Sequence, residues 1–282
     1  MTRRPAAQRF DGAAVIITGA SSGLGAALAV AFTEAGGNVV LAARNEDRLN
    51  EVAERCVEAG GQPLVIPADV TVPADCQALV GAAVERLGRL DVLVACAGLS
   101  MWGRFDELDD AEVLRRVMDV NYWGLVHPAH FALPHLKASG GVLVAISSVQ
   151  GKLGVPYHSG YAASKHAVQG FCDSLRMELA GSGVEVLTVL AHWIRGTNLR
   201  QQALGSDGLP RGDRAAAHGS GAVPLEKITR RILNAIARRR RMIFIPRWMR
   251  LFTWLSELAP PLTDRLIRKR VNREATGTHR SA

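Results

Sequence analysis

The sequence has few of the features that mark secreted, metal-binding or membrane-spanning proteins. Its 282 residues include four cysteines, Cys56, Cys76, Cys96 and Cys172, and no two of them form a Cys-x-x-Cys pair. We therefore expect four reduced thiols, with no disulfide framework and no metal site. Every apolar run is shorter than the roughly 18 residues that a membrane-spanning helix needs. Residues 1–11 contain no apolar stretch of the kind found in a signal peptide. The sequence thus favours a cytoplasmic protein without a secretory signal.

Aromatic residues are also scarce, at 5%, so aliphatic side chains must fill the core. Apolar residues make up 48% of the chain and charged residues 21%, which is typical of a folded domain. The charge is unevenly distributed. Residues 1–226 carry 19 Lys/Arg and 23 Asp/Glu, a net charge of −4, whereas residues 227–282 carry 15 Lys/Arg and 3 Asp/Glu, a net charge of +12. A mildly acidic body therefore precedes a strongly basic end.

Short apolar runs alternate with helical patterns along most of the chain. The expected strands are 15–18, 39–42, 64–67, 91–95, 142–146 and 184–190, and the expected helices are 24–35, 47–59, 74–87, 109–136 and 161–180. Strands that are apolar throughout are buried on both faces, as in a parallel sheet covered by helices. The sequence therefore predicts an α/β, Rossmann-like doubly wound parallel sheet with a C-terminal helical extension.

Glycines cluster between the first expected strand and its helix, in the segment TGASSGLG of residues 18–25. Glycines let a backbone approach a pyrophosphate closely, and a helix N-terminus offers it free N–H groups and a positive dipole end. This context predicts nucleotide binding, and the alternative is a structural turn without a ligand. The residues expected to bind are Thr18, Gly19, Ser21, Ser22, Gly23, Leu24 and Gly25.

The end of the second expected strand indicates which nucleotide is bound. A carboxylate near Ala43 would bond the ribose of NAD(H), but the sequence there reads Ala43-Arg44-Asn45. The guanidinium of Arg44 suits a 2′-phosphate instead, through a bidentate charge-assisted contact. We therefore expect NADP(H) rather than NAD(H). The alternative is that Arg44 is a solvated surface arginine.

Tyr161 and Lys165 stand four residues apart in an expected helix, which places them on one face. A free tyrosine has a pKa of about 10, and a nearby ammonium should lower it and so make proton exchange easier. The pair therefore predicts an acid–base site, with a packing tyrosine beside a solvated lysine as the alternative. Ser147 and Ser148 end the fifth strand, at the edge of the sheet where ligands bind.

Together these motifs resemble the short-chain dehydrogenase/reductase family, in its single-domain form with a TGxxxGxG turn and a YxxxK pair. The resemblance extends over about residues 12–200. It assigns adenine contacts to Asp69 and Val70, after the third strand. Ala97 and Gly98 match the end of the family's NNAG motif after the fourth strand, although Ala and Cys replace both asparagines.

The resemblance also assigns roles in the reaction. The family's serine stands 13 positions before its tyrosine, which selects Ser148 to hold the substrate oxygen and leaves Ser147 as a strand-end cap. Tyr161 would give or take the proton, and Lys165 would hold the nicotinamide ribose and tune Tyr161. Asn121 matches a helix asparagine that holds a water beside the lysine, and its alternative role is to bridge backbone groups.

One block departs from the family pattern. After the sixth strand the family has Pro-Gly, an apolar residue and a threonine, whereas this chain has AHWIRGT at residues 191–197. The resemblance assigns nicotinamide contacts to Ile194 and Thr197. His192 is either a substrate contact or a loop side chain. The departure motivates an alternative function, a nucleotide-binding regulator without turnover.

Apolar residues indicate the nature of the substrate. The loop 151–158 lies between Ser148 and Tyr161, and Met101, Trp102 and Phe105 follow the fourth strand, either as a pocket wall or as core. Such a pocket suits a small hydrophobic carbonyl or alcohol. We expect one domain with an N-terminal tail (1–11), a cofactor-binding and catalytic core (12–197), a mobile substrate loop (198–225) and a basic amphipathic extension (226–282).

The basic extension bears on partners. Four arginines stand at 238–241, and apolar residues then recur at helical spacing among further Arg and Lys. Such a helix either packs over the pocket or a partner subunit, or lies on a membrane surface, which would make membrane binding a second alternative function. We expect no nucleic acid, because a basic end alone does not indicate it. The family resemblance implies a homo-oligomer.

Overall fold

Seven parallel strands form the central sheet, in the order β3-β2-β1-β4-β5-β6-β9. The structure is a computed structural model that describes residues 10–212 and 222–277. Each strand consists mainly of aliphatic residues, which suit a sheet buried on both faces. The strands are β1 Ala14–Thr18, β2 Asn38–Ala43, β3 Leu64–Pro67, β4 Val92–Ala95, β5 Val142–Ser148, β6 Glu185–Ala191 and β9 Met242–Ile245.

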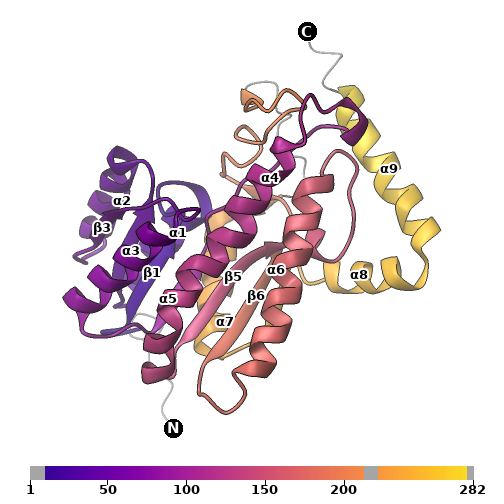
Figure 1. Cartoon of the computed structure of the whole chain (residues 1–282). Coiled ribbons are helices and arrows are strands. Elements are labelled where there is room, and N and C mark those ends of the chain that lie inside the picture. The colour runs from indigo at the N-terminus through magenta and orange to yellow at the C-terminus, as the bar shows by residue number, and fades with distance from the viewer. Residues whose placement is uncertain (1–9, 213–221, 278–282) are drawn as a thin grey trace.

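Helices cover both faces of this sheet (Figure 1). One face packs against α1 Gly23–Glu34, α2 Glu46–Glu58 and α7 Leu225–Ala237, and the other against α3 Pro73–Leu87, α5 Gly124–Ser139 and α6 Ser159–Glu178. Successive residues of β1 alternate between the two layers, so Val15 and Ile17 pack with α1 while Ile16 packs with α3 and α5. The predicted doubly wound α/β fold is confirmed.

The single helix predicted over 109–136 is divided into three segments. It consists of α4 Glu112–Met118, a π-helical turn η3 Asp119–Trp123, and α5. A π-helical turn adds a residue to one turn and changes the direction of the side chains around it, and such turns are frequent at functional sites. Here the turn contains the buried Asn121. Hydrophobic spacing does not reveal such a local change of pitch.

The predicted start of the C-terminal extension at residue 226 is wrong, because α7 and β9 belong to the core. Ile228, Ile232 and Ile236 of α7 are at most 2% exposed and lie in the same cluster as Leu28 of α1. β9 pairs with β6 and completes the sheet. The strand was missed because its four apolar residues stand between four arginines and Pro246.

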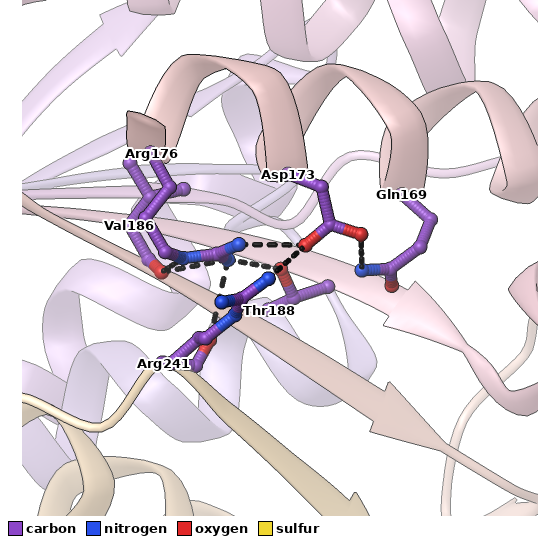
Figure 2. A network of polar contacts seen from close by, with 6 residues as sticks. All are labelled: Gln169, Asp173, Arg176, Val186, Thr188 and Arg241. Atoms are coloured by element: carbon purple, nitrogen blue, oxygen red, sulfur yellow. Dashed lines mark hydrogen bonds and ion pairs between the residues drawn. The ribbon is translucent and has the colours of Figure 1, made fainter. Parts of the chain in front are cut away.

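Polar contacts hold β9 in place. Asp173 of α6 accepts hydrogen bonds from Arg176 at 2.7 Å and from Arg241, just before β9, at 3.1 Å (Figure 2). Arg176 also donates to the backbone carbonyls of Val186 in β6 and of Arg241. Arg239 donates to the backbone carbonyl just after α5. Two of the four arginines in this run therefore make tertiary contacts, with α6 and with the chain just after α5, although their side chains are 64% and 44% exposed.

The segment predicted as a mobile loop over 198–225 lies partly outside the described residues. Its described parts contain some regular pairing. Leu204 forms isolated bridges with Met101 and with Pro210. The short strand β8 Val223–Pro224 pairs with β7 Ile194–Arg195. These contacts attach the segment to the chain that follows β4 and β6.

Two helices, α8 Met249–Leu258 and α9 Pro260–Gly277, follow β9 and lie beside the sheet (Figure 1). Met249, Phe252 and Ile267 pack with Leu153 and Val155, from the segment between β5 and α6. Among the described residues, no helix combines the length and the apolarity that crossing a bilayer requires. The true extension therefore consists of α8 and α9, and it contacts the chain next to β5.

The assignment of α7 to the core can be tested by stability. We expect Ile232→Ala to lower the free energy of unfolding by about 2–5 kcal/mol, because the side chain is fully buried. Leu258→Ala, at a position that is 84% exposed, should change it by less than about 0.5 kcal/mol. Urea denaturation of the two variants and of the unmodified protein measures both changes. Equal effects of the two substitutions would contradict a core position for α7.

Candidate active site

A cavity of about 830 Å³ lies at the carboxyl ends of the central strands. This is the edge where a doubly wound sheet binds its ligands. All but two of the predicted site residues line this cavity. The two exceptions are Thr18 and Asn121. The predicted residues that line it are Gly19, Ser21, Ser22, Gly23, Leu24, Gly25, Arg44, Asp69, Val70, Ala97, Gly98, Ser148, Tyr161, Lys165, Ile194 and Thr197.

The glycine turn packs directly against the chain that follows β4. Gly19 has a φ of +66°, and a Cβ there would lie 2.8 Å from backbone atoms of Ala97. A Cβ at Gly25 would lie 2.2 Å from the carbonyl oxygen of Gly19. Beneath the turn, the Thr18 hydroxyl accepts hydrogen bonds from the backbone N–H groups of Cys96 and Ala97. The turn therefore requires glycine for its own geometry as well as for the approach of a ligand.

The first turn of α1 suits a phosphate. α1 begins at Gly23, which lines the cavity with Leu24. Ser22 makes no side-chain capping hydrogen bond, and the first turn of α1 holds no acidic residue. Side chains therefore leave the positive end of the α1 dipole uncompensated at the cavity. This arrangement fits the pyrophosphate of a dinucleotide.

Two arginines line the cavity near the end of β2. Arg44 has a side chain that is 77% exposed, and its Nη1 lies 3.9 Å from Oδ2 of Asp69. Asn45 caps α2 by accepting a hydrogen bond from the backbone N–H of Arg48. Arg48 is the second arginine that lines the cavity here. Arg48 was missed in the sequence, although its position four residues after Arg44 offered a signal. A pair of guanidinium groups fits a phosphate better than a free ribose.

Asn121 connects α6 to the chain that follows β4. Its Oδ1 accepts a hydrogen bond from the N–H of Leu99, and its Nδ2 donates to the Leu99 carbonyl and to the Ser164 hydroxyl. Ser164 in turn donates to the Tyr161 carbonyl. Both amide hydrogens of Asn121 are thus used within the protein. Ser164 was missed, and its signal was its place three residues after Tyr161, on the same helix face.

Tyr161 and Lys165 lie together in a desolvated environment. Both are buried, and Nζ of Lys165 lies 5.6 Å from the centre of the Tyr161 ring and donates to the Ile146 carbonyl at 3.1 Å. Burial raises the pKa of Tyr161 to about 12, and a hydrogen bond with Ser148 acts in the opposite direction. Burial lowers the pKa of Lys165 to about 8. The predicted lowering of the Tyr161 pKa is therefore wrong, because desolvation by burial outweighs the hydrogen bond with Ser148.

The end of β5 supplies further polar groups. Oγ of Ser148 accepts a hydrogen bond from the backbone N–H of Gln150 at 3.1 Å, which orients the hydroxyl. Ser147, Ser148 and Gln150 all line the cavity. Within the described part of the chain, Oγ of Ser147 and Oε1 of Gln150 are buried without a hydrogen-bond partner. Such groups suit a ligand that completes their hydrogen bonds.

The block that departs from the family pattern still lines the cavity. The hydroxyl of Thr197 donates to the Ile194 carbonyl, and the Thr197 side chain would lie 3.3 Å from a Cβ at Gly23. His192 also lines the cavity, stacks on Trp193 and donates its backbone N–H to Ile245. Burial lowers the pKa of His192 to about 4, so the ring is neutral at physiological pH. The segment after β6 therefore still forms one wall of the cavity, although it lacks the Pro-Gly pair of the family pattern.

Aromatic rings border the substrate side. Trp102 stacks on Tyr157 with ring centres 5.3 Å apart, and it also contacts His158, which lines the cavity. Burial lowers the pKa of His158 to about 4. Met101 is fully buried and packs with Tyr161, so its role is in the core. Phe105 is 68% exposed and belongs neither to the core nor to the cavity wall.

Known proteins share this sequence pattern. A family model described as short chain dehydrogenase matches residues 13–206. The chain is 36% identical over 259 residues to "11-beta-hydroxysteroid dehydrogenase-like 4A" of Arabidopsis thaliana, which covers 90% of this chain and 83% of that protein. It is 39% identical over 275 residues to "Dehydrogenase/reductase SDR family protein 7-like" of Anopheles gambiae, which covers 95% of this chain and 86% of that protein.

A solved structure agrees with the sequence matches. The short-chain dehydrogenase/reductase from Burkholderia phymatum in complex with NAD aligns with a TM-score of 0.79 and 28% identity, over 90% of this chain and 96% of that chain. The family model alone spans more than half of the protein. The chain therefore belongs to the short-chain dehydrogenase/reductase family of oxidoreductases, which use NAD(P)(H).

Proposed function

We propose that the protein is an NADP(H)-dependent oxidoreductase that interconverts a carbonyl and an alcohol on a hydrophobic substrate. One observation carries the proposal: a single cavity is lined by the glycine turn and Arg44 and also by Ser148, Tyr161 and Lys165. Residues suited to a dinucleotide and residues suited to proton transfer thus share one space. The family membership supports the reaction class.

The residues present fit a nicotinamide dinucleotide. Gly19 and Gly25 leave no room for side chains where the turn meets its neighbours, and the uncapped start of α1 suits the pyrophosphate. Arg44 and Arg48 would hold a 2′-phosphate. Ile194 and Thr197 would contact the nicotinamide. When bound, the cofactor supplies or accepts a hydride. The NAD complex of the solved relative leaves the cofactor of this chain open, because the preference depends on the residues after β2.

The residues at the other end of the cavity would manage the proton. Ser148 would donate a hydrogen bond to the substrate oxygen and orient it. Tyr161 would transfer its Oη proton to that oxygen during reduction and recover one during oxidation. With its pKa raised by burial, Tyr161 stays protonated at neutral pH and is ready to donate. Lys165 would supply a positive charge beside Tyr161, and Asn121 would fix the end of β4 against α6.

The substrate side favours an apolar molecule with one polar group. Trp193 lines the cavity together with His158 and His192, whose rings are neutral, and Trp102 stacks on Tyr157 beside His158. Such a pocket binds by apolar contact and uses a few polar groups for orientation. The relative from Arabidopsis is named for hydroxysteroid dehydrogenase, which agrees with a bulky apolar alcohol or ketone.

Removal of one hydroxyl tests the role of Tyr161. We expect Tyr161→Phe to lower kcat by about 10²-fold or more, because the proton donor is lost, while the affinity for NADPH is kept. Tyr122→Phe removes the same hydroxyl from a residue that does not line the cavity, and it should leave kcat unchanged. NADPH consumption is followed with a panel of apolar ketones and aldehydes. Full activity of Tyr161→Phe would refute the role, and NADPH binding without turnover by the unmodified protein would favour the non-catalytic alternative.

Replacement of Arg44 tests the cofactor preference. A hydrogen bond to a charged group contributes about 1.5–3 kcal/mol, so Arg44→Ala should weaken NADPH binding by about 10-fold to 100-fold. The affinity for NADH should not change, because NADH has no 2′-phosphate. Arg55→Ala, on the exposed surface of α2, is the control for a lost positive charge. Calorimetric titration measures the affinity of each protein for NADPH and for NADH. An equal loss of affinity for the two nucleotides in Arg44→Ala would contradict 2′-phosphate recognition.

A further inference from the structure

Large apolar side chains are exposed in one short part of the molecule. In the part of the chain that the structure describes, thirteen large apolar residues are exposed, and seven of them fall between residues 248 and 266. We call these seven the α8–α9 apolar face. Single exposed apolar residues are ordinary, but a concentration of them marks a surface that binds something. The face consists of Trp248, Leu251, Trp254, Leu255, Leu258, Leu262 and Leu266.

Helical geometry accounts for the exposure. Leu251, Trp254, Leu255 and Leu258 stand at positions i, i+3, i+4 and i+7, so they share one side of α8. The opposite side of α8 is the one that packs on the protein, where Thr253 is 2% exposed. In an ordinary surface helix the apolar side faces the core. α8 packs Met249 and Phe252 on the protein and presents a second apolar side, of leucine and tryptophan, to the surroundings.

Basic residues accompany the apolar face. Between residues 247 and 272 the chain holds six Lys/Arg and two Asp/Glu. Arg247, Arg250, Arg265, Arg268 and Lys269 are all exposed, and the guanidinium of Arg250 lies 5.0 Å from the centre of the Trp254 ring. Tryptophan and aliphatic residues combined with Arg and Lys on one short helical segment fit the interface of an anionic bilayer. A protein partner would need a surface that is both apolar and acidic.

The helices that carry this face also contact the substrate side of the cavity. Phe252 of α8 and Ile267 of α9 pack in one cluster with Leu153, which follows β5. The guanidinium of Arg270 in α9 lies 5.1 Å from the centre of the Trp193 ring, and Trp193 lines the cavity. Contacts of α8 and α9 with an outside surface would therefore take place close to the cavity wall that Trp193 forms.

We propose that the α8–α9 apolar face docks on the surface of a bilayer that contains anionic lipids. The leucine and tryptophan side chains enter the boundary between headgroups and acyl chains, and the nearby arginines and lysine pair with lipid phosphates. The helices lie at the interface and do not cross it. Docking is independent of the reaction class, because none of its residues belongs to the catalytic group.

Vesicle co-sedimentation of the full chain tests the proposal. The unmodified protein should pellet with vesicles of phosphatidylcholine and phosphatidylserine, and less with phosphatidylcholine alone or at high salt. The double variant Leu251→Glu/Leu258→Glu should bind at least about 10-fold more weakly, because two apolar side chains no longer enter the bilayer. Both positions are exposed, so the fold should be kept, which circular dichroism and thermal unfolding check.

A matched variant controls for charge. Val57→Glu/Met177→Glu adds the same two carboxylates at positions that are 59% and 71% exposed on other helices. It should pellet like the unmodified protein, and equal loss in both variants would overturn the proposal. Failure of the unmodified protein to bind anionic vesicles would also overturn it. If it then forms an oligomer that Leu251→Glu/Leu258→Glu dissociates, measured by light scattering, a second copy of the chain covers the face instead.

Discussion

A parallel strand that is apolar on both faces reaches water only at its ends, and this constraint places the chemistry of the protein. Val15, Ile16 and Ile17 bury alternate sides of β1, so no functional group can stand along the strand itself. Polar and glycine residues gather instead where β1, β2, β4 and β5 end. The cavity at that edge is lined by the glycine turn, Arg44 and Ser148, which lie far apart in the sequence.

Desolvation sets the protonation states within the cavity. It keeps Tyr161 protonated, brings the pKa of Lys165 close to neutrality and keeps the rings of His158 and His192 neutral. Burial is the largest cause of all four shifts, so a change in the solvation of the cavity on ligand binding would alter them together. A hydrogen bond in such desolvated surroundings is electrostatically stronger than the same bond in water, since the local dielectric is low.

The basic end of the chain serves two different structural purposes. Arg239 donates to the backbone carbonyl just after α5, and Arg241 donates to the Asp173 carboxylate of α6, so both attach the chain before β9 to the core helices. The arginines and the lysine of α8 and α9 stand among exposed leucines and tryptophans and contribute little to the core. A net charge summed over residues 227–282 therefore combines residues that complete the fold with residues that face outward. Only their contacts separate the two groups.

The sequence by itself determined the doubly wound sheet, the glycine turn and the Ser148, Tyr161 and Lys165 group, because apolar runs and short spacings are local properties of the chain. Tertiary structure decided what depends on distant neighbours. β9 joins the sheet through its pairing with β6, Asn121 is oriented by Leu99 and Ser164, and the Tyr161 pKa rises because burial outweighs the hydrogen bond with Ser148. The burial of a side chain and the pairing of a strand depend on residues far apart in the chain, so a local sequence pattern cannot predict them.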